Sequence, residues 1–498
     1  MVKRRAAILT AVILAACGPA SPAAPTPGTL APAVSPTSPP ASPSTGPSPS
    51  AKPLASPPVG FYHLRLEFST TSDWSTLQLL HPESVLAIRL VETSGGPTAL
   101  EAGLAQLSLN QPLAAAEAVE RVGMTVDYAL DAAAAGQTLD FRLEKGALNG
   151  SVIRLSLVEG DQETLIEEVR HRIVVPGNPG RNPLEICFSL RSLQPVAASV
   201  VVQDRVETPR LLWAFYYPWY ASGDWSSPML SDHPLVPYDS ADEGTILRHI
   251  EQAQEAGIDG FISSWWGPGS DTDQALGTLL DLAAERGFWV TIYFETLTEE
   301  GGRDSREILA WLSYAIETYR DHPAFLRVDG KPLIVLWASA TVPLDSWDEI
   351  LGLLRQRGLD AVYLGMGYSV ANLEVFDGLH EYGVFTIPDL AQVEASTGRA
   401  VHAYSLLAPG DMPKIWAATV QPGYDDRLIP GREGLLQERN QGQFYRDTFE
   451  AAIASDPDWI FITSWNEWWE HTHIEPSEHN GELYLDITRE YARQWKGE

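Results

Sequence analysis

From about residue 210 to the C-terminus, short apolar runs alternate with longer stretches that have the amphipathic spacing of helices. Strands and helices that alternate in this way are typical of a parallel β/α fold. The apolar runs cover residues 211–217, 260–264, 289–295, 333–337, 361–365, 383–385, 415–420 and 459–464. Eight strands within roughly 290 residues is the usual scale of a (β/α)8 TIM barrel. We therefore predict an α/β domain of this type over residues 207–498.

The stretches between these runs predict the outer helices of the barrel. A helical repeat of apolar residues occurs at 245–256, 274–286, 306–319, 347–357 and 444–454. The sixth strand is the least regular of the eight, because residues 376–412 follow no clear period.

Residues 59–206 have a different sequence pattern, in which apolar and polar residues alternate over short segments. Such segments occur at 61–68, 152–157 and 171–175, with Gly, Asn and Pro between them. This pattern predicts an all-β sandwich domain that precedes the barrel, with one short helix at 114–122. Trp74 is the only tryptophan before residue 207, whereas the other fifteen follow it. The composition therefore favours a structural spacer over a sugar-binding domain.

Residues 1–17 have the layout of an export signal, with Lys3, Arg4 and Arg5 before an apolar run that is too short to span a bilayer. The segment 14–17 resembles the lipobox of bacterial lipoproteins, where cleavage leaves a lipidated Cys17 at the amino terminus. An ordinary signal peptide that contains a cysteine is the alternative. Residues 18–58 favour the lipid anchor, because Pro, Ala, Ser, Thr and Gly form an extended linker. We expect an extracytoplasmic, cell-surface lipoprotein of a bacterium.

The charge of the chain restricts its partners. The formal net charge is −31, from 65 acidic and 34 basic residues. Nucleic acid and anionic membrane surfaces would be repelled, so we expect no nucleic-acid partner and no membrane contact except through the lipid. A neutral polysaccharide or oligosaccharide fits better, bound by a monomer. With Cys17 lipidated, Cys187 has no disulfide partner.

The residues that follow the predicted strands are rich in aromatic and acidic side chains. In a TIM barrel the active site forms at the carboxyl ends of the strands. Sugars have apolar faces ringed by hydroxyls, so aromatic side chains next to carboxylates and amides match their chemistry. The substrate-binding residues predicted on this basis are Tyr216, Tyr217, Trp219, Trp265, Trp266, Glu295, Tyr424, Asn466 and Trp469.

Glu467 and Glu470 follow the last predicted strand and are the predicted catalytic pair. Cleavage of a glycosidic bond uses two carboxyl groups in different protonation states. Mutual repulsion separates the pKa values of neighbouring carboxyls, which keeps one of them protonated near neutral pH. Two glutamates three residues apart are weak support alone, and their place in an aromatic cluster after the eighth strand is what favours catalysis.

A metal site is the alternative reading of the residues after this pair. His471, His473 and Glu475 alternate on an extended segment, so their side chains would point the same way. No third histidine or cysteine at a strand end accompanies them, and we therefore expect no metal and no cofactor. Asp425 and Asp426 are equally compatible with binding substrate hydroxyls and with a solvated turn.

The last strand and the following loop resemble the signature of glycoside hydrolase family 99, which contains endo-α-mannosidases and endo-α-mannanases. The segment 459–476 carries this resemblance, because the family stretch Asn-Glu-Trp-His-Glu-Gly-Thr-Gln-Ile-Glu aligns with residues 466–475. Further agreements are at 215–220, 264–267, 328–332 and 422–425, so the resemblance spans about 210–498.

The resemblance implies a retaining, endo-acting α-glycosidase on a (β/α)8 barrel that needs no metal. It implies that Glu467 acts as the base on the sugar 2-hydroxyl, giving a 1,2-anhydro intermediate, and that Glu470 is the general acid toward the leaving oxygen. It also implies that Glu295 binds sugar hydroxyls and that Trp266 is a sugar platform.

The chain departs from the family pattern at three places. Trp469 stands where the family has His, and His471 stands where it has Gly. The third strand lacks the family pattern His-Glu-Pro-Tyr-Lys at 294–297. The missing lysine concerns contacts to mannose, so the reaction class is better defined than the sugar. Short features are also similar to family 71, the endo-α-1,3-glucanases.

Three functions are compatible with these patterns. The first is an endo-α-glycosidase that hydrolyses α-mannan or a related α-linked polysaccharide outside the cell. The second is a cell-surface lipoprotein that binds glycans without cutting them, and the third is a structural surface protein. Only hydrolysis accounts for two neighbouring carboxylates, whose repulsion is costly.

Overall fold

The computed structural model describes residues 60–497, apart from 72–73, 81–83, 95–97, 102–105, 111–120, 133–137, 146–149, 172–183, 192, 198–207, 299–300, 409–412 and 433. The predicted signal, Cys17, the linker and the boundary at 206/207 lie outside these residues. Among the described helices, none has the length and hydropathy that crossing a bilayer requires.

The first domain is a sandwich of two antiparallel sheets. One sheet has the order β3-β6-β1-β8-β9, with β11 (Val196–Ala197) beside β1, and the other has the order β10-β7-β2-β5-β4. Tyr128 and Phe141, from the two sheets, meet edge to face at 6.4 Å, which places the core between them. The longer strands are β1 (Gly60–Thr70), β3 (Val85–Ser94), β6 (Val122–Asp131), β7 (Thr138–Lys145), β8 (Ser151–Glu159), β9 (Gln162–His171) and β10 (Leu184–Ser189), and the shorter ones are β2 (Trp74–Leu79), β4 (Thr98–Glu101) and β5 (Gln106–Asn110).

The alternating pattern of the sequence explains the sandwich. In β1, Leu64, Leu66 and Phe68 are fully buried, whereas the residues between them are half-buried. The prediction of an all-β domain is confirmed. Most of the helix predicted at 114–122 lies outside the described residues, and Val122 is the first residue of β6.

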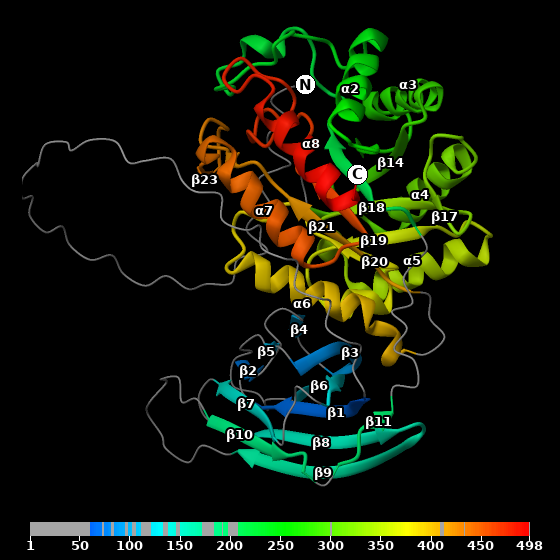
Figure 1. Cartoon of the computed structure of the whole chain (residues 1–498). Coiled ribbons are helices and arrows are strands. Elements are labelled where there is room, and N and C mark those ends of the chain that lie inside the picture. Colours follow the sequence, from blue (N-terminus) through cyan, green and yellow to red (C-terminus); the bar gives the residue numbers. More distant parts are fainter. Residues whose placement is uncertain are drawn as a thin grey trace, which may run out of the picture.

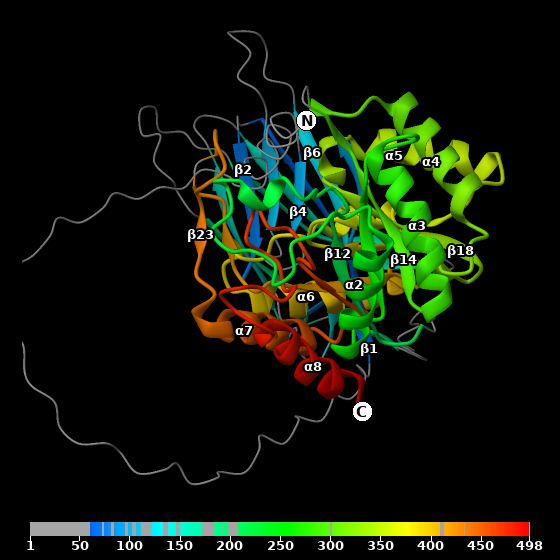
Figure 2. The same cartoon turned by 90° about the horizontal axis from the view of Figure 1, so that it is seen from above.

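The second domain is a closed barrel of eight parallel strands (Figures 1 and 2). Each strand pairs with the next along the chain, and β12 pairs with β24 to close the ring. The predicted (β/α)8 fold is confirmed. The barrel strands are β12 (Leu211–Tyr216), β13 (Gly260–Trp265), β14 (Trp289–Glu295), β18 (Lys331–Trp337), β19 (Val362–Met366), β20 (Gly378–His380), β21 (Ile415–Val420) and β24 (Trp459–Ile462).

Helices cover the outside of the barrel, and Figure 2 shows α3, α4 and α5 on one side of it and α6 and α7 on another. The five predicted helices form, with ends within a few residues of the prediction, whereas α6 and α8 were not predicted. The helices are α2 (Glu243–Glu255), α3 (Asp271–Arg286), α4 (Ser305–Tyr319), α5 (Leu344–Gln356), α6 (Leu390–His402), α7 (Gln443–Ala454) and α8 (Leu483–Lys496).

The sixth strand was predicted at 383–385 and this is wrong, because the strand is β20 at Gly378–His380. Gly378 packs so closely on the neighbouring strand that a Cβ atom would lie 2.4 Å from the carbonyl oxygen of Ile415. His380 is fully buried and lies 3.1 Å from the Leu336 carbonyl oxygen. A glycine and a histidine in a three-residue strand give no apolar run that a sequence pattern could detect.

The sandwich packs on the barrel where a helix is missing. Between β19 and β20 the chain forms only the short 3-10 helix η5 (Val370–Glu374). The edge strand β3 lies against this turn and α6 (Figure 1), and Arg89 binds the Glu374 carboxylate at 3.0 Å and the Leu407 carbonyl at 3.1 Å. Leu407 also joins a small apolar cluster with Phe61 and Ala129 of the sandwich. The two domains therefore share a buried interface.

Leu407→Ala tests this interface. Leu407 is 2% exposed and packs on Phe61 and Ala129 of one sheet of the sandwich, so removing its side chain leaves a cavity at the interface. We expect the free energy of unfolding to fall by about 2–4 kcal/mol. Urea unfolding followed by tryptophan fluorescence measures this. Leu428→Ala, at a side chain that is 42% exposed, is the matched control, and an equal loss in both variants would contradict a packed interface.

Candidate active site

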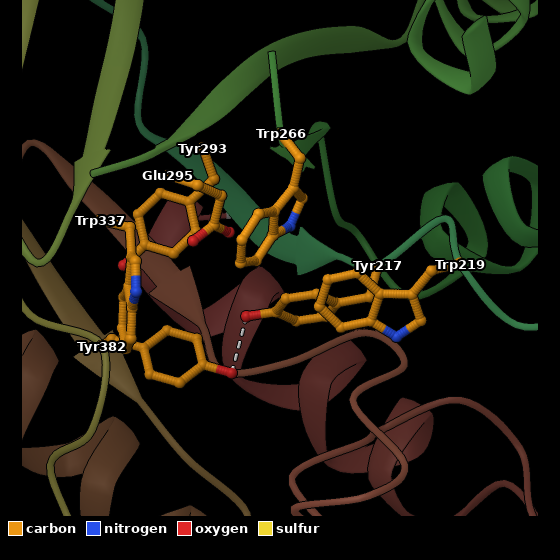
Figure 3. A pocket seen from close by; sticks show the side chains of 7 residues that line it. All are labelled: Tyr217, Trp219, Trp266, Tyr293, Glu295, Trp337 and Tyr382. Atoms are coloured by element: carbon orange, nitrogen blue, oxygen red, sulfur yellow. Dashed lines mark hydrogen bonds between the residues drawn. The ribbon is translucent and has the colours of Figure 1, made fainter. Parts of the chain in front are cut away.

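A narrow cavity lies at the carboxyl ends of the barrel strands, with about 330 Å³ of empty space when its opening to solvent is included (Figure 3). Six aromatic side chains and one carboxyl group surround it. The residues follow β12 and β13, end β14 and β18, or follow β20. They are Tyr217, Trp219, Trp266, Tyr293, Glu295, Trp337 and Tyr382. Flat apolar rings around a single acid form a site suited to a sugar ring.

Glu295 is the only acid in this wall. It is 5% exposed, and the Ser264 hydroxyl donates to its Oε1 at 2.6 Å. The Trp266 indole in turn donates to the Ser264 hydroxyl at 3.1 Å. Burial raises the pKa of Glu295 to about 8, so this carboxyl is uncharged at neutral pH.

Glu467 lies fully buried behind this cavity. Its Oε1 accepts hydrogen bonds from the Tyr220 hydroxyl at 2.9 Å and from the Trp469 backbone N–H at 3.2 Å. Within the described part of the chain its Oε2 has no hydrogen-bond partner. Burial, followed by the charge on Glu470, raises the pKa of Glu467.

Glu470 is in a different environment, because a cation faces it. The Arg432 guanidinium donates to Glu470 Oε1 at 2.7 Å, and both side chains are only 3% exposed. Arg432 also donates to the Tyr424 hydroxyl at 2.9 Å and to Asp426 Oδ2 at 3.3 Å. Burial raises the pKa of Glu470, and the Arg432 charge opposes this shift.

The two carboxyl groups adjoin the cavity but do not line it. The Tyr217 and Tyr382 hydroxyls, which hydrogen-bond at 2.7 Å, form the wall next to them (Figure 3). Burial is the main cause that raises the pKa of Tyr382, and the charges on Glu470 and Glu467 raise it further. Both carboxyl groups therefore lie near that wall. The pair therefore lies beside the cavity and outside its lining.

Trp469 and Asn466 support the cavity from behind. Trp469 is 5% exposed and stacks on Trp219 at 6.0 Å and 13°. Asn466 is fully buried and uses its amide on the Tyr217 backbone, accepting from the N–H at 2.8 Å and donating to the carbonyl at 3.0 Å. Asn466 therefore positions Tyr217, whereas direct substrate contact was predicted.

Tyr216 and Trp265 were predicted as substrate contacts and the structure places them elsewhere. Successive side chains of a strand point to opposite faces, so these two point to the helix layer while their neighbours Tyr217 and Trp266 point to the cavity. Tyr216 stacks on Phe261 at 4.7 Å. The Trp265 indole is fully buried and donates to Asp273 at 2.8 Å. Tyr424 is 2% exposed and holds Arg432, as described above.

His471, His473 and Glu475 do not converge on one point. His471 contacts Ser231 and the Asp425 carbonyl, and His473 stacks on Trp468 at 3.8 Å. Glu475 accepts from the Tyr238 hydroxyl at 2.9 Å and from the Trp468 indole at 3.2 Å. Over the described residues, no three His, Cys, Asp or Glu side chains cluster as metal ligands would.

Sequence reasoning missed five residues of this site, which are Tyr220, Tyr293, Trp337, Tyr382 and Arg432. Tyr293 and Trp337 carried a usable signal, because Tyr293 is two residues before Glu295 in one strand and Trp337 ends a predicted strand. Arg432 lies in a loop, and Tyr382 follows the strand that the sequence misplaced.

Glu295→Gln tests the buried, uncharged carboxyl. The folded protein keeps this proton up to about pH 8, whereas the ordinary pKa of the group is 4.5, so the wild type loses stability as the pH rises between these values. The amide carries no charge, so the variant avoids this loss. We compare the free energy of unfolding of the variant with that of the wild type. The difference, variant minus wild type, should be roughly 1–4 kcal/mol larger at pH 8 than at pH 5. Urea unfolding at both pH values measures it.

The control is Glu438→Gln at an exposed position. It should leave the pH dependence unchanged. A Glu295→Gln variant with the same pH dependence as the wild type would mean that Glu295 is ionised in the folded protein.

Comparisons with known proteins identify relatives of the barrel. The model of glycosyl hydrolase family 99 matches residues 224–495, which excludes the sandwich. A mouse glycoprotein endo-α-1,2-mannosidase-like protein is 24% identical over 375 residues, covering 61% of this chain and 80% of the relative. Rat glycoprotein endo-α-1,2-mannosidase is 25% identical over 373 residues, with 61% and 79% covered.

A solved structure is similar as well. The GH99 endo-α-mannosidase from Bacteroides thetaiotaomicron, in complex with bis-tris propane, is 26% identical with a TM-score of 0.51. The match covers 58% of this chain and 98% of that protein.

Proposed function

The chain belongs to glycosyl hydrolase family 99 and is a glycoside hydrolase, and we propose from this premise that it cleaves internal bonds of α-mannan or a related α-linked polysaccharide with retention. The observation that carries the proposal is the pair Glu467 and Glu470. The two carboxyls are buried together, but a cation faces only one of them. Two such groups in unlike environments are what glycosidic cleavage uses.

The cavity supports a neutral, sugar-sized ligand. Its aromatic lining offers platforms for the apolar faces of a ring, and Glu295 in its protonated form is able to donate to or accept from a hydroxyl. The relatives named as endo-α-1,2-mannosidases favour mannose. Trp469, at the position of the family's His, adds an indole behind Trp219 and makes this wall more apolar.

The roles follow from the family resemblance. Glu467 takes the proton of the 2-hydroxyl, O2 attacks C1, and the C1–O bond breaks while Glu470 gives its proton to the leaving oxygen. Water then opens the 1,2-anhydro sugar at C1, with the proton transfers reversed, and the configuration at C1 is retained. Each step leaves one proton on the pair of carboxyls.

The two carboxyl groups differ in their surroundings. Burial raises the pKa of both, and the Arg432 guanidinium, whose charge opposes this shift, is hydrogen-bonded to Glu470. A 2-hydroxyl that donates to the unpartnered Oε2 of Glu467 would favour its ionised form. We therefore infer that substrate binding favours the ionised form of Glu467, which is the form that the proposed base requires.

The proposed setting is the outer surface of a bacterial cell, with the protein anchored as a monomer through a lipid on Cys17. The sequence supports this through the basic residues, apolar run and cysteine of 1–17, and through the linker 18–58. An enzyme held on such a tether would reach polymers outside the cell.

The Glu467→Gln and Glu470→Gln variants test the catalytic pair. Each keeps the shape of the side chain but removes its acid–base chemistry, so kcat/KM should fall by about 10³-fold or more. Release of reducing ends from α-1,2-, α-1,3- and α-1,6-linked mannans and glucans measures it and identifies the sugar. Glu349→Gln, at an exposed glutamate of α5 away from the cavity, is the control. Full activity in either variant would reject the pair, and binding without any cleavage by the wild type would make the protein a glycan-binding lipoprotein.

Arg432→Met separates the two roles. Without the cation Glu470 keeps its proton to higher pH, because the charge that favours its ionised form is gone. If Glu470 is the acid, the alkaline limb of the profile of kcat/KM against pH moves up by about one pH unit. A shift of the acidic limb instead would make Glu470 the base. Arg427→Met is the control, because this arginine pairs with Asp425 while 52% exposed.

A further inference from the structure

Tyr220 is the only residue of the described chain whose side chain hydrogen-bonds to the Glu467 carboxyl. It lies in the loop after β12 and is 1% exposed. Its side chain does not line the cavity, so it does not meet a ligand bound there. Any effect of Tyr220 on the proposed glycosidase activity must therefore pass through Glu467.

The direction of the Tyr220 hydroxyl proton follows from the two hydrogen bonds of this group. The oxygen accepts from the Trp468 backbone N–H at 2.9 Å, and Glu467 Oε1 lies 2.9 Å from it. A backbone N–H is a donor only, so the tyrosine proton finds no acceptor on that side. The proton therefore points to Glu467 Oε1.

The ring of Tyr220 is held between two indoles, which fixes this direction. Trp225 stacks on the ring at 5.2 Å and 25°, and Trp469 meets it edge to face at 5.1 Å. The Trp225 indole donates to the Tyr238 carbonyl at 2.6 Å. The backbone of Tyr220 exchanges two hydrogen bonds with Ser240, of 2.7 and 3.1 Å. A donor fixed in this way does not reorganise when charge forms on its acceptor.

The two oxygens of Glu467 consequently have different surroundings. Oε1 accepts from the Tyr220 hydroxyl and, at 3.2 Å, from the Trp469 backbone N–H. Oε2 has no hydrogen-bond partner in the part of the chain that the structure describes. Both donors direct a proton at Oε1, so a further proton on that oxygen would be repelled. A proton carried by Glu467 is therefore held on Oε2.

We propose that Tyr220 is a positioning residue of the glycosidase, which makes Oε2 the basic oxygen of Glu467 and stabilises the carboxylate through Oε1. This role rests on the proposed function, in which Glu467 takes the proton of the sugar 2-hydroxyl. That proton passes to Oε2, O2 bonds to C1, and the leaving oxygen takes the proton of Glu470, while Tyr220 keeps its own. A hydrogen bond to the charged form of an acid favours that form. Tyr220 therefore makes a buried base easier to ionise.

Other ionisable side chains also face Glu467, from its own loop and from the loops after β12, β20 and β21. They are Glu470, Tyr217, Tyr382 and Arg432. Burial is the main cause that raises the pKa of Glu467, the charge on Glu470 adds to it, and the hydrogen bond from Tyr220 lowers it. The hydroxyls of Tyr217 and Tyr382 bond to each other instead (Figure 3). Removing the Tyr220 hydroxyl therefore acts on Glu467 directly.

Tyr220→Phe tests the proposal, because it keeps the ring and removes only the hydroxyl. Without this donor the pKa of Glu467 rises, so more of the base is protonated at low pH. The acidic limb of the profile of kcat/KM against pH should move up by about one pH unit, and the alkaline limb should stay in place. The substrate is the α-linked polymer that the wild type cleaves.

Tyr363→Phe is the matched control, since the Tyr363 hydroxyl in β19 is buried without a hydrogen-bond partner among the described residues. It should leave both limbs unchanged. For Tyr220→Phe, a fall in kcat/KM by the same factor at every pH would overturn the proposal, because the hydroxyl would then only support the fold. So would limbs that coincide with those of the wild type, or a shift of the alkaline limb alone.

A second measurement needs no activity. The pKa of Glu467 lies above its ordinary value in the folded protein, so stability is lost as the pH rises. Tyr220→Phe raises this pKa further, and its urea midpoint should fall further below that of the wild type at pH 9 than at pH 6. With Glu467→Gln in both proteins, the gap should be equal at the two pH values.

The unfolding data separate this role from the proposed function. A gap that does not change with pH while Glu467 is present would overturn the role of Tyr220, whatever the activity. A wild type that cleaves no α-linked polymer would reject the proposed function, and the gap would still decide whether Tyr220 stabilises the carboxylate.

Discussion

The site depends on keeping two carboxyl groups buried within one loop of the barrel. Burial disfavours the charge on both Glu467 and Glu470, and the charge on Glu470 adds to this cost at Glu467. Arg432 offsets this cost at Glu470, with a hydrogen bond of 2.7 Å between two side chains that are almost inaccessible. A cation at one carboxyl gives the two groups unequal proton affinities. The loop that carries Arg432 is therefore as much a part of the site as the eighth strand.

This arrangement requires a rigid loop after β24, and its hydrogen bonds supply the rigidity. The Ser464 hydroxyl accepts from the Glu467 N–H at 2.8 Å, and it hydrogen-bonds to the Thr472 hydroxyl at 2.8 Å. Glu475 anchors the Trp468 indole, and its other oxygen lies 3.0 Å from His249 of α2. The loop is thereby tied to itself and to the first helix of the barrel. Groups fixed in this way do not need to reorganise when charge develops in a reaction.

The amino acids predicted the architecture well because the barrel strands are buried on both faces. Such strands read as continuous apolar runs, and seven of the eight were found in this way. For the same reason the sequence did not show which side chains point into the barrel and which point to the helices. A continuous apolar run has no alternation of polar and apolar residues from which the two faces could be told apart. Tyr216 and Tyr217 are equal candidates in the sequence, and only the register of β12 decides that Tyr217 faces the cavity.

The pairing of distant loops is what no local pattern contains. Arg432 lies 38 residues before Glu470, in a segment with no regular spacing, and the contact exists because β21 and β24 are neighbours in the ring. Tyr382 meets Tyr217 across the barrel mouth although 165 residues separate them. Strand order in a closed barrel determines which loops can meet, so the acids were predictable from their strand ends. Their partners had to come from irregular loops, where composition does not distinguish an arginine that pairs with a buried acid from one exposed to solvent.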